Sequence, residues 1–433
     1  MKIQTLLVSL LLTVFLLVPT VIQASPASET AAETGPVKVV YWRSLTGAAG
    51  DAQEELVKRF NESQTRVVVE AQFQGAYADL VQKLLAGLAA GEVPDLVLLD
   101  SPFVVLFAKD GVLVPIDEFA ANTKTGLDLK GFIPGLLQDG YYKGKLYALP
   151  MMRSTPLLYY NRDMFKEVGL PDRVPDTWDE FKEFCEKLSK VEGGEKVRWG
   201  AAFTMGRTTA HWYLQGAIYA FGGEVSDENF NILLEQPPAV AAAQLWQDLV
   251  FKYKTAIPGN PEGDAQADFL NGRVGMVFGS TGSMANLMNR AKFALGAGFM
   301  PGQVRHMVPV GGSVIAMTST DKARQSAAWE FMKYVTSAAS NSYIIQQTGY
   351  MPTSKAAMDY PDTVAYFNQY PERKIAVEQL QYARPQASVI SLGKGTEILR
   401  QAVEKLLIGG VPAPQVMKEA AIDLRKEYED TFK

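Results

Sequence analysis

The sequence has few of the residues on which metal sites and catalytic sites most often depend. It contains one cysteine, Cys185, and two histidines, His211 and His306, in 433 residues. A single cysteine excludes an internal disulfide, and a zinc site would lack its usual ligands. Lysine and arginine are spread along the chain and the net charge is only −5, which disfavours a nucleic-acid or membrane surface. We therefore expect no metal, no cofactor and no nucleic-acid partner.

The start of the chain has the pattern of a secretory signal. Lys2 precedes an apolar run over residues 6–18, which is too short to span a membrane and ends near small residues. We predict a signal peptide over 1–24 and a flexible polar tether over 25–36. A lipid anchor would need a cysteine at the cleavage point, so the predicted location is the periplasm, without an anchor.

Strand and helix signals then alternate. Apolar runs at 37–42, 67–73 and 95–99 are each followed by a helical pattern or a turn. This alternation is typical of a mostly parallel sheet covered by helices, in which ligands bind beyond the carboxyl ends of the strands. By this rule, the loops expected to contact a ligand begin near Arg43, Tyr77 and Asp100.

The remaining roughly 400 residues exceed what one core usually serves, so two lobes are expected. Residues 151–161 form an extended segment that suits a crossing between lobes. A capped amphipathic helix is predicted over 176–188, with Cys185 buried on its apolar stripe. We assign the first lobe to 37–152 plus 280–336 and the second lobe to 153–279 plus 337–433.

Five blocks of sequence carry a resemblance to a known family. They are YWRSLTGAAGDAQEELVKRFNE (41–62), ALPMMRSTPLLYYNRDMFKEVGL (148–170), the DTWDEF helix, FLNGRVGMVFGSTGSMANL (269–287) and QQTGYMPTSKAA (346–357). These blocks resemble the extracellular solute-binding proteins of carbohydrate ABC importers. The resemblance implies an α/β fold of two lobes, the type II periplasmic binding protein fold, with a ligand cleft that closes about a hinge. Within the family, the STPLLYYN block and the GSTGS loop are similar to members that bind glycerol-3-phosphate.

The resemblance also implies six ligand contacts. They are Tyr77, Ser154, Ser280, Gly312, Tyr350 and Arg400. The loop of Ser280 precedes a predicted helix, where free N–H groups favour an anion. Arg400 offers a planar fork for a phosphate, although an ion pair with Glu404 on the same helix is its ordinary alternative role.

Five further residues are candidates for ligand contact at positions where the sequence departs from the family pattern or where sugar sites use aromatic rings. They are Trp42, Asp100, Ser101, Arg153 and Trp212. The family has an acidic residue after the third strand, and its place falls on Ser101 or on Asp100 here. Asp100 has an alternative structural role as the cap of a helix near Pro102. Trp42 ends a buried strand, so packing in the core is the alternative to ligand contact for this residue. Arg153 adds a second cation beside Ser154.

These observations predict a monomeric periplasmic binding protein that is not an enzyme. It would capture glycerol-3-phosphate or a glycerophosphodiester and deliver it to the permease subunits of an ABC importer. One alternative is a neutral oligosaccharide, for which Trp42, Tyr77, Asp100 and Trp212 would supply stacking and hydroxyl acceptors. A secreted hydrolase of phosphodiesters or glycans is a further alternative, although no segment singles out a nucleophile or a carboxylate pair.

Overall fold

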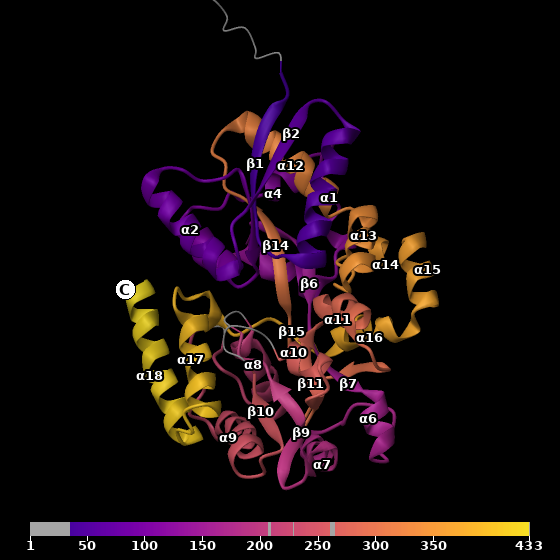
Figure 1. The fold of residues 1–433 in the computed structure, drawn as a ribbon. Helices are drawn as coiled ribbons and strands as arrows, with labels where there is room; N and C mark the ends of the chain where they lie inside the picture. The colour runs from indigo at the N-terminus through magenta and orange to yellow at the C-terminus, as the bar shows by residue number, and fades with distance from the viewer. Residues whose placement is uncertain (1–34, 207–208, 228, 260–264, 433) are drawn as a thin grey trace, which may run out of the picture. The chain divides into compact units, whose positions relative to one another are not determined.

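The structure is a computed structural model that describes residues 35–206, 209–227, 229–259 and 265–432. The predicted signal peptide and nearly all of the tether lie outside these described residues. Two β-sheets with surrounding helices make up the described chain, which confirms the predicted two-lobe α/β fold (Figure 1). Within the described ranges, no helix is both long enough and apolar enough to cross a membrane.

The first sheet has five strands in the order β2-β1-β3-β14-β6. Its strands are β1 (Val37–Arg43), β2 (Val67–Phe73), β3 (Leu96–Asp100), β6 (Ala148–Ser154) and β14 (Gly311–Met317). β1 runs parallel to β2 and β3, whereas β14 is antiparallel to β3 and β6. Every residue of β3 is buried, as its continuous apolar sequence requires for a central strand.

The second sheet follows the order β10-β9-β11-β7-β12, with β8 paired to β9. Its strands are β7 (Pro156–Asn161), β8 (Lys190–Glu192), β9 (Glu195–Phe203), β10 (Ala256–Pro258), β11 (Val274–Ser280) and β12 (Leu295–Phe299). β7 is antiparallel to both β11 and β12. Gly296 of β12 permits this pairing, since a Cβ there would lie 2.2 Å from the Tyr160 ring. The sequence-based division at residue 280 assigned the residues of β12 to the first lobe, whereas β12 belongs to the second sheet. The exact lobe boundaries stay a prediction.

Two short pairs of strands lie outside these sheets. They are β4 (Tyr141–Tyr142) with β5 (Lys145–Leu146), and β13 (Val308–Pro309) with β15 (Ala383–Arg384). Lys143 and Gly144, which join β4 to β5, have φ values of 46° and 77°. Positive φ at both central residues is the geometry of a tight two-residue hairpin.

Helices cover the sheets and account for much of the chain. The longer helices are α1 (Gly47–Ser63), α2 (Tyr77–Ala90), α7 (Trp178–Leu188), α8 (Ala210–Ala220), α9 (Pro237–Phe251), α12 (Lys322–Val335), α13 (Ala338–Thr348), α15 (Pro361–Gln369), α17 (Gly395–Leu407) and α18 (Ala413–Phe432). The shorter helices are α3 (Phe103–Lys109), α4 (Asp117–Ala121), α5 (Pro134–Leu137), α6 (Arg162–Glu167), α10 (Gln266–Leu270), α11 (Met284–Arg290), α14 (Lys355–Met358) and α16 (Ile375–Glu378). The 3-10 turns are η1 (Leu129–Gly131), η2 (Gln138–Gly140), η3 (Thr281–Ser283), η4 (Pro371–Lys374), η5 (Gln379–Tyr382) and η6 (Ser388–Ser391). α1, α2 and α12 contact the first sheet, α7 to α10 contact the second sheet, and α17 packs along α18 (Figure 1).

The start of α7 confirms the local pattern from which this helix was predicted. The hydroxyl of Thr177 accepts a hydrogen bond from the Glu180 N–H at 3.1 Å and so caps the helix. Cys185 is fully buried on the apolar side of α7, beside Trp178 and Phe181 in one core cluster. Burial raises the pKa of the Cys185 thiol well above its ordinary value, so this residue acts as a small hydrophobe.

The chain crosses between the two sheets within a single residue. β6 ends at Ser154 in the first sheet, β7 begins at Pro156 in the second sheet, and Thr155 lies between them. This confirms the predicted extended segment over 151–161. The chain returns between the end of β12 and Gly311, the first residue of β14. Ser154 and Gly311 are therefore placed together at the junction of the two sheets, where they pair across β6 and β14.

Candidate functional site

A cavity of about 580 Å³ lies at this junction and is called the main cavity below. It is lined by residues from strands and loops of both sheets. Of the residues selected from the sequence, those that line it are Tyr77, Asp100, Ser154, Trp212, Ser280, Gly312 and Tyr350. Its volume falls in the range of roughly 300–1,000 Å³ that is usual for small-molecule sites. The structure thus brings together seven of the eleven selected positions.

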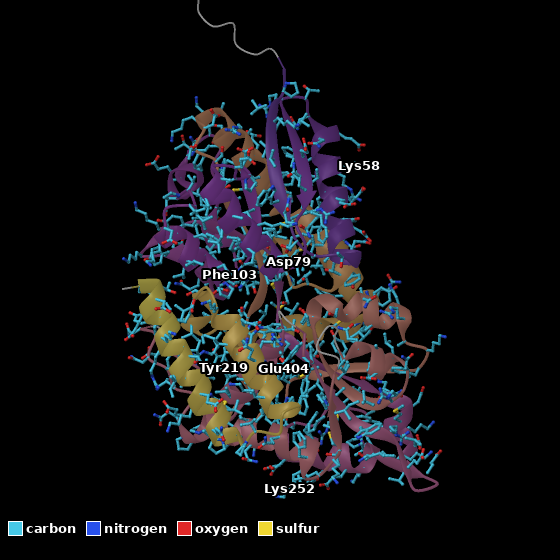
Figure 2. The ribbon with its side chains drawn as sticks, turned by 60° about the vertical axis from the view of Figure 1, so that its left-hand side comes forward. Lys58, Asp79, Phe103, Tyr219, Lys252 and Glu404 are labelled. Carbon is cyan, nitrogen blue, oxygen red and sulfur yellow. The ribbon has the colours of Figure 1, made fainter. Side chains whose placement is uncertain are left out.

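Arg400 does not line the main cavity. It lies on α17, where its guanidinium donates to the carboxylates of Glu397 and Glu404 at 2.8 Å. Figure 2 shows the position of Glu404 on this helix. The ordinary alternative, an ion pair along the helix, is therefore the arrangement that the structure has.

Trp42 also lies away from the main cavity. Its indole N–H donates to Gln72 Oε1 at 3.0 Å, and its ring comes within 3.5 Å of where a Cβ on Gly87 of α2 would be. The ring therefore packs between the first sheet and α2. This is the core role that its position at the end of a buried strand had offered as an alternative.

Arg153 is fully buried and acts on the cavity wall through other residues. Its guanidinium forms an ion pair with Asp139 and donates to the Gly312 carbonyl at 2.9 Å. Asp139 also accepts a hydrogen bond from the Ser101 hydroxyl at 3.1 Å. Arg153 and Ser101 thus hold the strand that carries Gly312 rather than lining the main cavity. Gly312 itself has φ = 86°, and a Cβ there would lie 2.1 Å from the Met152 carbonyl oxygen.

A cluster of buried polar groups faces the main cavity from the first sheet. Tyr77 is the first residue of α2, Asp100 is the last residue of β3, and Tyr350 follows α13. The hydroxyls of Tyr77 and Tyr350 and the Asp100 carboxylate are near enough to influence one another's pKa. Among the described residues, neither Tyr77 Oη nor Asp100 Oδ1 makes a hydrogen bond of normal geometry. Buried polar atoms without partners are rare in folded proteins, and a ligand is one explanation for them.

Burial determines the charge state of this cluster. It raises the pKa of Asp100 to about 7, against the opposing effect of the nearby Arg153. Burial likewise raises the pKa of Tyr350 to about 12 and the pKa of Tyr77 well above its ordinary value, so both hydroxyls are neutral donors at pH 7. Asp100 does not cap a helix, because α3 begins after Pro102 without a side-chain cap.

The loop after β11 differs from the predicted backbone anion cradle. The Ser280 hydroxyl accepts the Gly282 N–H at 3.1 Å, and the Thr281 N–H donates to the Thr155 carbonyl at 3.0 Å. Two of the N–H groups expected to bind an anion are therefore already bonded within the protein. Ser280 still contributes its own hydroxyl hydrogen as a donor at the cavity wall.

α8 contributes two neighbouring residues to the cavity, and sequence reasoning selected only one of them. Trp212 packs against Gly311, where a Cβ would lie 2.8 Å from the indole ring, and its Nε1 has no partner among the described residues. His211 is buried beside it, which lowers the pKa of His211 to about 4, and it shares a side-chain hydrogen bond with Gln386. No sequence signal identified His211, because it lies in an apolar helix without a catalytic partner nearby in the chain.

A second cavity of about 460 Å³, called the side cavity below, shares Gln386 with the main cavity. Arg384 lines the side cavity and is the only arginine or lysine among the described residues that line either cavity. Its Nη1 pairs with Glu224 at 2.6 Å, and its guanidinium lies 4.7 Å from the centroid of the Tyr219 ring on α8, which is labelled in Figure 2. Sequence reasoning missed Arg384, since the two-residue strand β15 in which it stands has no recognisable motif.

Two α/β lobes with a polar cavity at their junction define a binding protein for a small solute. A family model of bacterial extracellular solute-binding proteins matches residues 55–374. The chain belongs to this family.

Curated relatives and solved structures extend the likeness over most of the chain. The sn-glycerol-3-phosphate-binding periplasmic protein UgpB of Pectobacterium atrosepticum is 27% identical, over 91% of this chain and 93% of the relative. The crystal structure of UgpB from Mycobacterium tuberculosis in complex with glycerophosphocholine has a TM-score of 0.84 and 30% identity, covering 92% of this chain and 100% of that chain. The GacH receptor of Streptomyces glaucescens, solved in the unliganded form and with acarbose, has a TM-score of 0.79 at 21% identity, covering 91% and 99%. This last likeness supports the fold alone.

Proposed function

We propose that this chain is the periplasmic solute-binding component of an ABC importer and that its ligand is glycerol-3-phosphate or a glycerophosphodiester. The observation that carries the proposal is the set of buried polar atoms at the main cavity that make no hydrogen bond of normal geometry in the described chain, those of Tyr77, Asp100 and Trp212. The relatives that bind glycerol-3-phosphate or glycerophosphocholine support this choice of ligand. In this proposal the protein acts as a monomer and catalyses no reaction.

The cavity offers a complementary group for each part of such a ligand. The carboxyl group of Asp100, whose pKa is raised to about 7, accepts hydrogen bonds from glycerol hydroxyls. The neutral hydroxyls of Tyr77 and Tyr350 donate to phosphate oxygens, together with Ser154 and Ser280. The phosphate is held near Arg384 rather than near Arg400, because Arg384, which also pairs with Glu224, is the one arginine among the described residues that line either cavity.

A neutral oligosaccharide remains a second candidate because three of the four residues selected for it line the main cavity. Tyr77 and Trp212 supply aromatic rings and Asp100 supplies a hydroxyl acceptor, whereas Trp42 lies elsewhere. Sugar hydroxyls would satisfy the same unpartnered atoms. The phosphate charge is therefore the feature that distinguishes the two candidates.

Isothermal titration calorimetry of the mature protein tests the proposal. The ligands are glycerol-3-phosphate, glycerophosphocholine, maltose and trehalose. Phosphorus NMR reports any turnover of the two phosphate ligands, and proton NMR reports any turnover of the two disaccharides. We expect both phosphate ligands to bind and neither to be hydrolysed. Binding of a disaccharide without binding of either phosphate would favour the oligosaccharide candidate, and release of inorganic phosphate or glycerol would favour a hydrolase.

A further inference from the structure

The side cavity differs from the main cavity in the chemistry of its wall. It is lined by three aromatic residues, Tyr141, Tyr142 and Phe230, and by the carboxylates of Asp139 and Asp227. We propose that the side cavity binds the alcohol substituent of a phosphodiester and that it prefers a substituent carrying a positively charged ammonium group. This inference rests on the proposed function, since it needs the glycerol phosphate part of the ligand in the main cavity.

The two cavities adjoin at defined residues. Asp100 lines the main cavity and the next residue, Ser101, lines the side cavity. From the second sheet, Gln386 lines both, and Arg384 stands two residues before it. A phosphate held near Arg384 would therefore leave a glycerol group on one side of Gln386 and an ester substituent on the other side.

One carboxylate at the wall of the side cavity has no cationic partner among the described residues. Asp139 pairs with the buried Arg153, and Arg384 pairs with Glu224, so each of these ion pairs is close to neutral. The carboxylate of Asp227 is held in place at 2.9 Å by the backbone N–H groups of Asn229 and Asn231 and is the group that would face a cation. With the Lys143 ammonium beside the Tyr142 ring, the wall and its direct partners are neutral in sum, so the preference depends on the position of Asp227 and on the aromatic rings.

The aromatic rings are held in fixed positions by their neighbours. Phe230 packs against Tyr428 and Phe432 with ring centroids 5.2 and 5.1 Å apart. Tyr142 stands on the tight hairpin of β4 and β5, and the Lys143 ammonium lies 5.4 Å from the centroid of its ring. That separation is within the range of a cation–π contact, so one face of this ring holds the ammonium of Lys143 and a ligand cation would need the other face or the ring of Tyr141.

Calorimetric titration of the mature protein with matched diesters tests the inference. Glycerophosphocholine carries a quaternary ammonium, whereas glycerophosphoglycerol carries a neutral substituent of similar length. We expect glycerophosphocholine to bind roughly three- to thirty-fold more tightly, the range for an ammonium group placed on aromatic rings. Equal affinities for the two diesters would overturn the inference while leaving the proposed function intact.

Two variants locate the preference. Tyr142→Ala removes a ring and should bring the affinity ratio of the two diesters close to one, whereas Tyr142→Phe keeps the ring and should keep most of the ratio. Tyr141→Ala provides a second test in case Tyr142→Ala disturbs the hairpin, and circular dichroism checks the folding of each variant. A ratio that persists in both alanine variants would overturn the assignment to the side cavity. Failure of both diesters and of glycerol-3-phosphate to bind, with maltose bound, would overturn the proposed function and this inference together.

Discussion

The ring of Tyr350 lies directly against the backbone of Gly282, so that a Cβ on Gly282 would come within 2.6 Å of the ring. Tyr350 follows α13 and belongs to a core cluster of the first sheet, whereas Gly282 lies in the loop after β11 of the second sheet. The contact therefore joins a cavity-lining residue that packs with the first sheet to a cavity-lining loop that follows a strand of the second sheet. The absence of a side chain at Gly282 determines where the Tyr350 hydroxyl lies.

Gly282→Ala should displace this ring and weaken ligand binding. The added methyl group has no space, since Tyr350 is itself buried, and overpacking of this kind typically costs about 1–3 kcal/mol. We expect an affinity loss of about ten-fold or more for glycerophosphocholine, measured by calorimetry. Gly135→Ala is the matched control, because a Cβ at Gly135 meets no atom within 4 Å. Equal affinities of Gly282→Ala and the wild type would contradict a role for Tyr350 in binding.

Arg384→Ala should weaken a phosphate ligand by on the order of 10- to 100-fold, because a charge-assisted contact sheltered from water is worth a few kcal/mol. Arg384→Lys should restore only part of this affinity, since an ammonium lacks the planar fork. Arg400→Ala is the matched control and should change affinity less than two-fold, since its charge is shared between Glu397 and Glu404 on α17. A larger loss of affinity in Arg400→Ala than in Arg384→Ala would instead assign the phosphate contact to Arg400.

The sequence was sufficient to predict residues that stand where strands end. The rule for parallel strands pointed to the loops near Tyr77 and Asp100, the family resemblance made both residues candidates, and the structure puts both at the main cavity. Strand and helix periods predicted β1, β2, β3 and α7 closely, since each depends on a local pattern of apolar residues.

Features that depend on distant contacts were not predictable in this way. Arg400 was selected for a phosphate from the family resemblance, and its position on a helix does not reveal whether its side chain faces a cavity or its own helical neighbours. Arg384 and His211 were missed because the cavities they line form only when loops and α8 pack against other parts of the chain. The placement of β12 depends on its pairing with β7, which begins 139 residues earlier in the chain. No local sequence pattern indicates a pairing over that separation.

Asp100 should make a contribution to the free energy of unfolding of the ligand-free protein that falls as the pH rises from about 4 to 7. The pKa of Asp100 is raised to about 7 in the folded chain, so within this interval the folded carboxyl binds the proton more tightly than the unfolded one does. With roughly 1.4 kcal/mol for each pKa unit, the fall amounts to a few kcal/mol. His211 acts in the opposite direction because its pKa is lowered to about 4, so the contribution of Asp100 is measured as a difference between variants. In urea denaturation, the stability of Asp100→Asn relative to the wild type should increase with pH, whereas that of Asp423→Asn, at an exposed position on α18, should not. A difference between Asp100→Asn and the wild type that stays constant from pH 4 to 7 would contradict this role of Asp100.

Ligand binding should draw the two lobes together. The groups that would contact one small molecule come from both sheets, with Tyr77 and Asp100 on one side and Trp212 and Ser280 on the other. The chain crosses from β6 to β7 through Thr155 alone, which suits a hinge at which small backbone rotations move whole lobes. Small-angle X-ray scattering should therefore give a smaller radius of gyration with saturating glycerophosphocholine than without ligand. Gly282→Ala at the same ligand concentration should show less compaction, because it misplaces the ring of Tyr350 on which closure depends. An unchanged scattering profile in a sample that calorimetry proves to be saturated would contradict hinge closure while leaving the binding site itself in place.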